Sequence, residues 1–268
     1  MTDDQKYAST IFFKAALPLA KVIAEDRPAL GKAFEGKTCI LQVSALVPEA
    51  EGGKQGMHFE IADGVWTTKL TVHESPDVEL EFGNIDKFVD FMAGRKMVGA
   101  LPKMKGMCKH FGLFLGFMKI LLKMASLLQA TDYPKTEEDR HLLVKLYFYL
   151  LAGGISALNK AGHPEIHEWA AKSPDRAYAF KVKGEGNEDL ASYIRVKAGK
   201  SKYCKGEYTR SKPFFCMSFD CVDSALGILM QKADMLEYTA TDKLIMEGAP
   251  EFGAQLGAFM MIIAGYAK

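Results

Sequence analysis

The sequence predicts an α+β fold with two similar domains, each a small, mainly antiparallel sheet covered by helices. Three observations support this prediction. Strand-like segments are grouped along the chain and do not alternate one-to-one with helices. The same series of elements occurs twice, and a polar segment separates the two occurrences. Each series ends in a strongly apolar helix, which indicates an apolar cavity or a deep core beneath it.

The composition is that of a folded soluble protein. Of the 268 residues, 25% are charged and 49% are apolar, and the formal net charge is +1. This balance gives no general electrostatic reason to expect a nucleic acid or an anionic membrane as partner. The five cysteines form no C-x-x-C pair and the N-terminal residues are polar, so we expect reduced thiols and a cytoplasmic protein.

A repeated string of residues divides the chain into halves. The string F-G-x-x-L-G occurs at 111–116 and again at 252–257, and Met-Lys-Gly or Met-Glu-Gly precedes it. Earlier stretches of the two halves also match, in the same order and at nearly the same spacing. Chance explains one such match but not three in register. We therefore expect duplicated domains at 1–130 and 131–268, joined by a polar linker at about 131–139.

Apolar spacing predicts the elements of the first half. A helix is expected over 8–25, and Pro28 fits the first turn of a second short helix. A further helix over 111–128 closes the half. The expected strands are 38–46, 57–61, 65–72 and 78–82.

Polar residues refine this prediction. Glu79 and Glu81 alternate with apolar residues, which predicts a strand with one solvated face. Asn84 is expected to cap the next helix, and Gly94 to end it. In the second half, Asp220 is expected to cap the equivalent helix. The other elements expected there are helices at 139–160, 164–172 and from 251, and strands at 177–183, 191–197, 203–209 and 213–219.

The last helix of each half is apolar around nearly its whole circumference. In 111–128 two lysines and a serine form one narrow polar stripe, and in 252–266 only Gln255 interrupts the apolar surface. Such a helix is buried on two sides, lies against a membrane or faces a cavity. Neither run has the uninterrupted length that crossing a bilayer requires, so we expect no spanning helix. Plain core, or an interface between domains, would give the same pattern as a cavity.

Each half resembles the lipid-binding domain of the sterol carrier protein 2 family. The matching features are the amphipathic helices at 84–94 and 220–230, the following strands that end in Gly106 and Gly248, and the terminal apolar helices. The turn in Phe59-Glu-Ile-Ala-Asp-Gly64 also resembles the early hairpin of that family. The resemblance covers nearly all of both halves and includes no catalytic signature.

One departure from the family pattern concerns the strand that ends in glycine. The family usually shows Gly-Lys-Leu before it, whereas the second half has Asp242-Lys243-Leu244 and the first has Leu101-Pro102-Lys103. Proline cannot donate a hydrogen bond within a sheet, so Pro102 predicts a shorter or an edge strand. The cavities of the two halves are therefore expected to differ.

The resemblance implies a tunnel between sheet and helices that accepts fatty acids, acyl-CoA, sterols or isoprenoids. Each buried methylene group of such a ligand contributes about 0.8 kcal/mol, and Met and Phe walls adapt to its shape. The residues that the pattern places at the ligand would serve equally well as ordinary core. They are Phe88, Met92, Phe111, Leu115, Met118 and Leu122 in the first half, and Leu226, Leu229, Phe252, Leu256, Phe259 and Ile263 in the second.

The sequence offers no pattern of catalytic residues. It contains no G-x-S-x-G, P-loop or H-E-x-x-H motif, and Gly184-Glu185-Gly186 is typical of a hairpin turn. His163 and His167 lie four residues apart, but Pro164 starts a helix between them and no third ligand follows, so we expect no metal site. We also expect no enzyme activity and no cofactor other than a bound lipid or fatty acid.

Three functions remain open from the sequence. A lipid carrier requires an apolar cavity, an interaction or dimerisation module requires an exposed apolar patch, and an enzyme on a lipid-like substrate requires converging polar groups. The basic and aromatic segment 197–212 fits a solvated sheet face better than a nucleic-acid site. That segment would also suit transient contact with anionic lipid headgroups. The expected partners are an apolar small molecule and, transiently, a membrane surface, but no nucleic acid.

Overall fold

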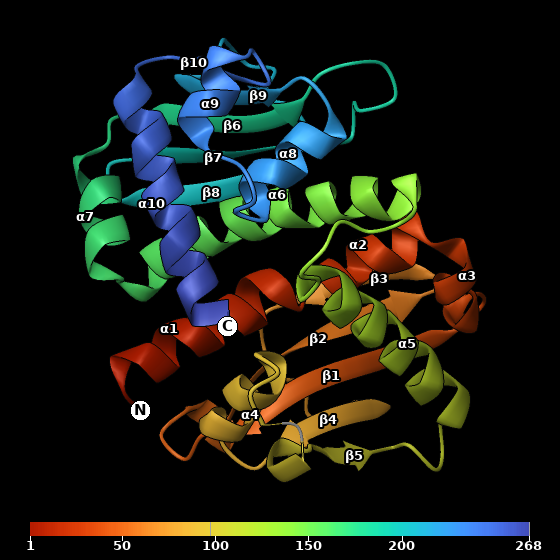
Figure 1. The fold of residues 1–268 in the computed structure, drawn as a ribbon. Helices are drawn as coiled ribbons and strands as arrows, with labels where there is room; N and C mark the ends of the chain where they lie inside the picture. Colours follow the sequence, from red (N-terminus) through yellow and green to blue (C-terminus); the bar gives the residue numbers. More distant parts are fainter. Residues whose placement is uncertain (97, 268) are drawn as a thin grey trace. The chain divides into compact units, whose positions relative to one another are not determined.

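A computed structural model describes residues 1–96 and 98–267 of the chain. These residues form two compact units: unit 1 comprises Met1–Ala125 with Tyr266–Lys268, and unit 2 comprises Ser126–Gly265. Each unit holds a five-stranded mixed sheet with helices, so the α+β class is confirmed and the architecture is consistent with two domains (Figure 1).

Unit 1 contains a sheet in the order β3-β2-β1-β4-β5. The β1 and β4 strands run parallel, whereas the other neighbours are antiparallel. Its strands are β1 (Thr38–Leu46), β2 (Lys54–Ala62), β3 (Val65–Lys69), β4 (Val78–Phe82) and β5 (Lys103–Lys105). Its helical elements are α1 (Asp3–Ile11), η1 (Phe12–Ala16), α2 (Leu19–Asp26), α3 (Pro28–Gly31), η2 (Lys32–Phe34), η3 (Glu51–Gly53), α4 (Ile85–Met92), η4 (Val98–Ala100) and α5 (Phe111–Leu128).

Local hydrogen bonds explain where several of these elements begin. The Thr2 hydroxyl accepts a bond from the Gln5 amide, while the Gln5 side chain accepts one from the Thr2 amide, which forms a capping box for α1. Asn84 accepts a bond from the Lys87 amide at 2.8 Å and caps α4, as predicted. The β5 strand is short and lies at the sheet edge, as Pro102 predicts.

Aromatic side chains form the core between the sheet of unit 1 and its helices. Phe88 of α4 stacks on Phe13 with 4.0 Å between ring centroids. Phe59 of β2 contacts Trp66 at 5.1 Å and Phe117 of α5 at 6.2 Å. The α5 helix is therefore attached to the sheet through its inner side.

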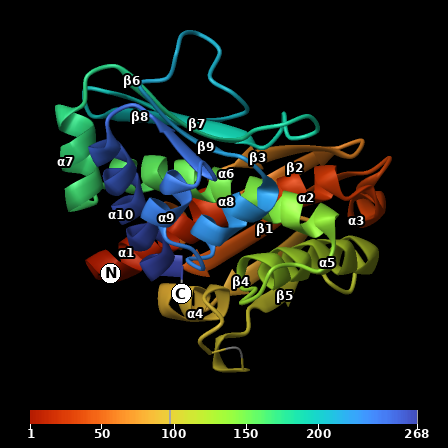
Figure 2. The same cartoon turned by 45° about the horizontal axis from the view of Figure 1, so that its top comes forward.

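Unit 2 contains a sheet in the order β10-β9-β6-β7-β8, with β6 and β9 parallel. Strand order and direction therefore match those of unit 1 when β6 is compared with β1. Figure 2 shows β6, β7, β8 and β9 of this sheet in a second view. Its strands are β6 (Arg176–Val182), β7 (Ala191–Lys197), β8 (Lys200–Lys205), β9 (Phe215–Phe219) and β10 (Leu244–Glu247). Its helices are α6 (Glu137–Ala161), α7 (Pro164–Lys172), α8 (Val222–Leu229), α9 (Met235–Ala240) and α10 (Pro250–Ala267).

A glycine occupies the same position at the end of each edge strand. Gly106 and Gly248 have φ angles of +75° and +123°. A Cβ atom on Gly106 would lie 1.8 Å from the carbonyl oxygen of Asp77, and one on Gly248 would lie 2.9 Å from that of Phe214. Both units therefore require glycine where the chain leaves β5 or β10 and passes close to another backbone segment.

In unit 2 one helix cap was predicted wrongly and one helix was not predicted. Cys221, not Asp220, is the N-cap residue of α8, because the helix begins at Val222 and the Cys221 carbonyl accepts its first helical hydrogen bond, from the Ala225 amide. The α9 helix has no predicted counterpart. Its sequence signal is Asp234, whose carboxylate accepts bonds from the amides of Leu236 and Glu237.

The lengths of three helical stretches correct the prediction about membrane spans. Asp3–Asp26, Phe111–Leu128 and Glu137–Ala161 are each long and apolar enough to cross a membrane, by length and composition alone. The first and third are 83% and 89% buried within the protein. Only 39% of Phe111–Leu128 is buried, so α5 is the least covered of the three stretches.

Candidate functional site

The strongest candidate for a ligand site lies in unit 2, where α7 and α10 pack on β6. Trp169 of α7 lies 5.1 Å from Phe259 of α10 and 5.1 Å from Tyr178 of β6, measured between ring centroids. Tyr178 also lies 6.1 Å from Phe252 at the start of α10. These distances are typical of packed aromatic pairs. Aromatic rings therefore occupy the layer between the sheet and the helices.

The Tyr178 side chain adds a buried polar atom to this layer. Tyr178 is 1% exposed, and its hydroxyl has no hydrogen-bond partner among the described residues. Nearly all buried polar atoms in proteins are hydrogen-bonded, and leaving one unbonded costs about 1–3 kcal/mol. The hydroxyl thus has a capacity to donate and accept hydrogen bonds that no described residue uses.

Arg176 adds a positive charge at the edge of the same layer. It lies two residues before Tyr178 on β6, so both side chains point to the same face of the sheet. The guanidinium carbon lies 3.8 Å from the ring centroid of Phe214 and 5.4 Å from that of Phe252. Phe214 is 37% exposed, so this end of the aromatic layer reaches solvent. The arrangement suits a molecule with an anionic head and an apolar body.

The six predicted contacts of unit 2 are buried or half-buried, and two of them belong to this layer. Leu226, Leu256, Phe259 and Ile263 are buried, while Leu229 and Phe252 are half-buried. Ring contacts bring two of them, Phe252 and Phe259, together with Tyr178 and Trp169. Sequence reasoning missed Arg176, Tyr178, Trp169 and Phe214. The available signal was the alternation Arg-x-Tyr in a strand, which puts a guanidinium and a phenol on one face.

The predicted contacts of unit 1 are placed differently. Phe88 is completely buried in the core, and Met92 and Met118 are half-buried. The other three lie on the outer side of α5, with exposed fractions of 61% for Phe111, 42% for Leu115 and 60% for Leu122. The inner side of α5 is formed by Leu113, Phe114, Phe117, Ile120 and Met124.

Unit 1 also lacks the polar groups of the unit 2 cluster. In the parallel strand pair of unit 1, Leu41 is paired with Val78. In the parallel strand pair of unit 2, Tyr178 is paired in the same way with Phe215. Leu41 therefore occupies the position that Tyr178 has in unit 2. By the same register, Cys39 stands where Arg176 does, and no guanidinium faces the layer from this position.

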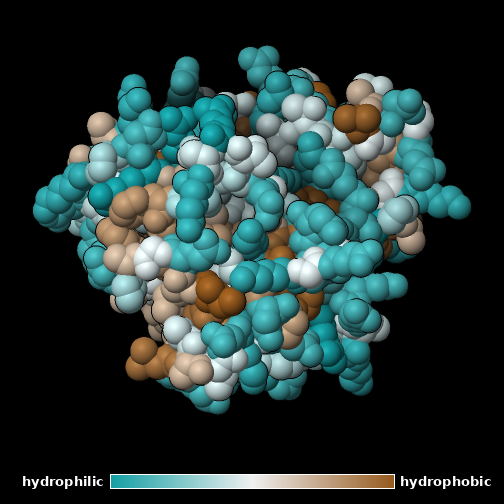
Figure 3. Space-filling model, turned by 90° about the horizontal axis from the view of Figure 1, so that it is seen from above, coloured by the Kyte–Doolittle hydropathy of each residue, from teal (hydrophilic) through white to brown (hydrophobic). Residues whose placement is uncertain are grey.

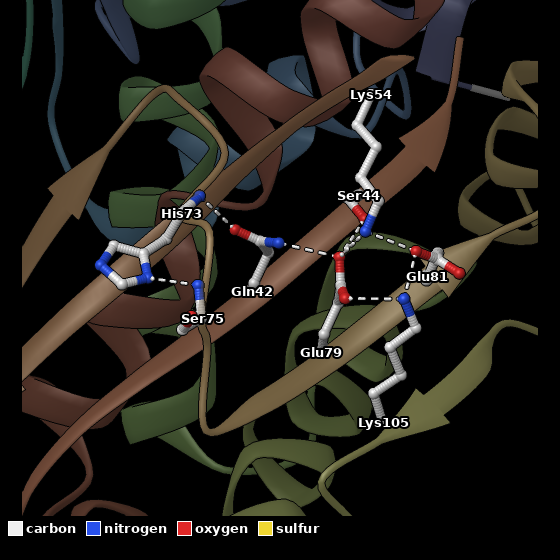
Figure 4. A network of polar contacts seen from close by, with 8 residues as sticks. All are labelled: Gln42, Ser44, Lys54, His73, Ser75, Glu79, Glu81 and Lys105. Carbon is white, nitrogen blue, oxygen red and sulfur yellow. Dashed lines mark hydrogen bonds and ion pairs between the residues drawn. The ribbon is translucent and has the colours of Figure 1, made fainter. Parts of the chain in front are cut away.

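The other face of the unit 1 sheet carries a network of buried polar side chains (Figure 4). Glu79 accepts hydrogen bonds from Gln42 at 2.8 Å, from Ser44 at 2.7 Å and from Lys54 at 2.9 Å. Glu79 and Glu81 are only 3% and 5% exposed, so the predicted solvated face is wrong. The physical reason is that Lys54 reaches across from β2 and covers both carboxylates, forming ion pairs with each.

Hydrogen bonds determine the charge state of this network. Burial by itself would raise the pKa of Glu79, but bonds from Lys54, Ser44 and Gln42 outweigh burial and lower the pKa to about 2. The pKa of Glu81 is also lowered, because bonds from Lys105 and Lys54 exceed the opposing effect of burial. Both carboxylates are therefore ionised and paired at neutral pH, which indicates a structural role and not that of a proton acceptor.

The histidines expected not to bind metal make other contacts. His163 is the N-cap residue of α7, as predicted, and the Nδ1 atom of His167 lies 3.1 Å from the side-chain oxygen of Asn159. Across residues 1–96 and 98–267, no group of three or more His, Cys, Asp or Glu side chains is arranged to hold a metal ion.

Comparisons with known proteins find structural likeness but no family. No family model and no curated protein matches the chain. A similar solved structure is the solution structure of a conserved hypothetical protein from Thermus thermophilus, for which a sterol carrier role is suggested. The two share 15% sequence identity with a TM-score of 0.30, over 52% of this chain and 92% of that chain. A likeness at this TM-score does not establish a shared fold, and membership of the sterol carrier protein 2 family is not shown.

Proposed function

We propose that this protein binds and carries apolar, lipid-like molecules and catalyses no reaction on them. The observation that supports this proposal is the unpartnered hydroxyl of Tyr178 inside an otherwise apolar layer of unit 2. Two residues predicted to contact ligand, Phe252 and Phe259, belong to the same layer. A buried polar atom of this kind is typical of a binding site, where it orients a ligand whose body is held by apolar contact.

The chemistry of the cluster favours a fatty acid over a neutral sterol or isoprenoid. A carboxylate would accept a hydrogen bond from the Tyr178 hydroxyl and be attracted by the Arg176 guanidinium, and such charge-assisted bonds are short and strong. The acyl chain would then extend along Trp169 toward Phe259. Each methylene group that displaces water from these rings contributes about 0.8 kcal/mol, so affinity should increase with chain length.

Binding requires the rings to separate, because they are in contact in this structure. Phe252 and Trp169 are the side chains best able to move, since both are only half-buried. We propose unit 2 as the binding unit. In unit 1 the position of Tyr178 is taken by Leu41, which offers no hydrogen bond to a head group.

The two tryptophans provide a direct test. Trp66 lies in unit 1 and Trp169 in the cluster of unit 2, so each unit has its own fluorophore. Oleate should change the fluorescence of the Trp66→Phe variant, in which only Trp169 emits, in a saturable way. The Trp169→Phe variant, in which only Trp66 emits, should respond little. Absence of a saturable Trp169 response would contradict the proposal.

The Tyr178→Phe variant tests the role of the hydroxyl. It retains the ring, so oleate affinity should fall about 10-fold to 100-fold, which corresponds to loss of one hydrogen bond to a charged group. The ligand-free variant should be more stable than the parent by about 1 kcal/mol, because an unbonded buried hydroxyl has been removed. A hydroxyl with a purely structural role would lower stability when removed. Tyr193→Phe, on the opposite face of the same sheet, is the matched control and should leave affinity unchanged.

A further inference from the structure

A long segment of unit 1 and its boundary is free of acidic residues. Residues 91–131 contain seven lysines and arginines and neither Asp nor Glu, in a chain whose formal net charge is only +1. Three of these basic residues have acidic neighbours elsewhere: Arg95 and Lys96 contact Asp90, and Lys105 contacts Glu79 and Glu81. Lys103, Lys109 and Lys119 are exposed. The segment therefore carries seven positive charges and no negative charge of its own.

The same segment holds a large share of the exposed apolar side chains. Of twelve large apolar residues that are exposed in the described chain, six belong to it. They are Val98, Leu101, Met104, Phe111, Leu115 and Leu122. The face of the molecule drawn in Figure 3 is mainly hydrophilic, with apolar patches between the polar side chains. Exposed apolar groups that concentrate in this way mark an interaction surface.

The α5 helix arranges both kinds of side chain for contact with a flat partner. Phe111, Leu115 and Leu122 follow one another at helical spacing and share the outer side of the helix, next to Lys119. The inner side is buried against the sheet: Phe117 is completely inaccessible. The helix thus presents an apolar stripe with a cation beside it while the rest of the unit holds it in place.

We propose that unit 1 docks on an anionic lipid bilayer through this surface, with α5 lying in the plane of the interface. An apolar stripe inserted at the boundary of headgroups and acyl chains, flanked by lysines, is the arrangement by which interfacial helices bind membranes. Each lysine near such a surface contributes favourably, and no carboxylate in the segment opposes it. The buried inner side of α5 distinguishes this mode from crossing the bilayer.

The positive charge of the segment favours an anionic bilayer over the other partners that an apolar surface could bind. A second copy of the chain would bring two acid-free, basic segments together, and they would repel each other. The basic segment 197–212, where membrane contact was first expected, adjoins acidic partners. Lys197 lies 3.4 Å from Asp175, Lys212 lies 3.4 Å from Glu247, and Glu207 belongs to the segment itself. The stripe on α5 is therefore the better complement to anionic lipid.

Sedimentation of the full chain with lipid vesicles tests the proposal. The protein should bind vesicles of phosphatidylcholine and phosphatidylserine, bind pure phosphatidylcholine weakly, and be released by high salt, which screens surface charge. Leu122→Glu and Leu115→Glu should each reduce partitioning at least about tenfold, because they place a carboxylate in the stripe. Lys119→Gln should reduce it about fivefold. Thermal unfolding should be nearly unchanged, since these side chains are exposed.

Matched variants elsewhere decide between this surface and others. Leu236→Glu changes a leucine of α9 that is 78% exposed, and Lys202→Gln changes an exposed lysine of the basic hairpin; neither should affect partitioning. The proposal is overturned if these controls lose as much binding as the α5 variants. It is also overturned if wild type ignores phosphatidylserine vesicles, if Leu122→Glu instead dissociates a dimer, or if alkaline washing fails to extract the protein. The vesicle experiment contains no oleate, and the Trp169 titration contains no vesicles. Membrane docking and fatty-acid binding can therefore be contradicted independently of each other.

Discussion

The last helices of the two units, α5 and α10, contain the same repeated string, but its leucine is exposed in α5 and buried in α10. Leu115 and Leu256 have the same place in F-G-x-x-L-G. Leu115 is 42% exposed on α5, whereas Leu256 is completely buried under α10. Identical letters in a repeat therefore do not guarantee equivalent positions in the fold.

The spacing of buried residues explains the difference. Phe117, Ile120 and Met124 of α5 are buried, and their spacing is repeated by the buried Leu256, Phe259 and Ile263 of α10. Phe117, and not Leu115, thus corresponds to Leu256. Successive residues of a helix are about 100° apart, so a shift of two positions moves a side chain to nearly the opposite side. The burial pattern is the feature that the two helices share.

The outer sides of the two helices also differ in chemistry. Three of the six exposed positions of α10 are small, at Ala254, Ala258 and Gly265. Met261 is the one large apolar residue exposed on the described part of this helix, which contains Glu251 but no lysine or arginine. The outer side of α5 has large apolar residues and lysines instead. This contrast supports a division of tasks, with a ligand layer under α10 and a docking surface on α5.

The largest expected effect comes from truncating the leucine of each repeated string, Leu256 in α10 and Leu115 in α5. Leu256→Ala should destabilise unit 2 by about 2–5 kcal/mol, because it removes buried methyl groups and leaves a cavity. Leu115→Ala should change the stability of unit 1 by less than about 0.5 kcal/mol, since the side chain is exposed. Urea unfolding followed through Trp169 or Trp66 separates the two units. Equal losses would show that both leucines are buried and that the comparison is mistaken.

Local patterns were sufficient to predict most of the fold. Thr38–Leu46 and Phe111–Leu128 have the predicted bounds, because alternation and helical spacing act within a single element. The solvated face of β4 was wrongly predicted because the lysines that cover Glu79 and Glu81 come from β2 and β5. Pairing across strands is not visible in the pattern of one strand.

The candidate site was predictable only in part, for a related reason. Phe252 and Phe259 were identified because they belong to the apolar face of one helix. Tyr178 was missed because its distinguishing feature is a hydroxyl without a hydrogen-bond partner. That feature depends on the side chains that α7 and α10 place around it. Sequence periodicity indicates that a residue is buried, but the satisfaction of its polar atoms requires the neighbours.

The sheet face that carries Glu79 and Glu81 in unit 1, and the equivalent face in unit 2, should contribute differently to stability at acid pH. At the positions of Glu79 and Glu81, unit 2 has Cys216 and Ser218. The pKa of Glu79 is depressed to about 2, so its ion pairs stabilise unit 1 fully above the ordinary carboxyl pKa of 4.5. That contribution, on the order of 2 kcal/mol, should be lost as the pH falls from 4.5 toward 2.

Unfolding of the Trp169→Phe variant between neutral and acid pH, followed through Trp66, measures this loss. Glu79→Gln should be less stable at neutral pH and should show a flatter pH dependence. In unit 2 a hydrogen bond from Arg195 lowers the pKa of Asp175 to about 2, but this pair lies at the surface. Added salt should therefore weaken the acid response of unit 2 while leaving that of unit 1. The same pH dependence in Glu79→Gln and wild type would exclude Glu79 as its source.

The smallest effect concerns two glycines of α5 that lie on different sides of the helix. A Cβ on Gly116 would lie 2.6 Å from the Cβ of Ala33 and 3.2 Å from the ring of Phe34, so Gly116→Ala should destabilise unit 1 by about 1 kcal/mol. A Cβ on Gly112 would meet nothing within 4 Å, so Gly112→Ala should stabilise the helix by about 0.5–1 kcal/mol. Opposite signs, measured by urea unfolding through Trp66, would show that Gly116 holds α5 close to η2. If both substitutions stabilise the unit, α5 is free to turn, and its stripe would no longer be confined to the outer side.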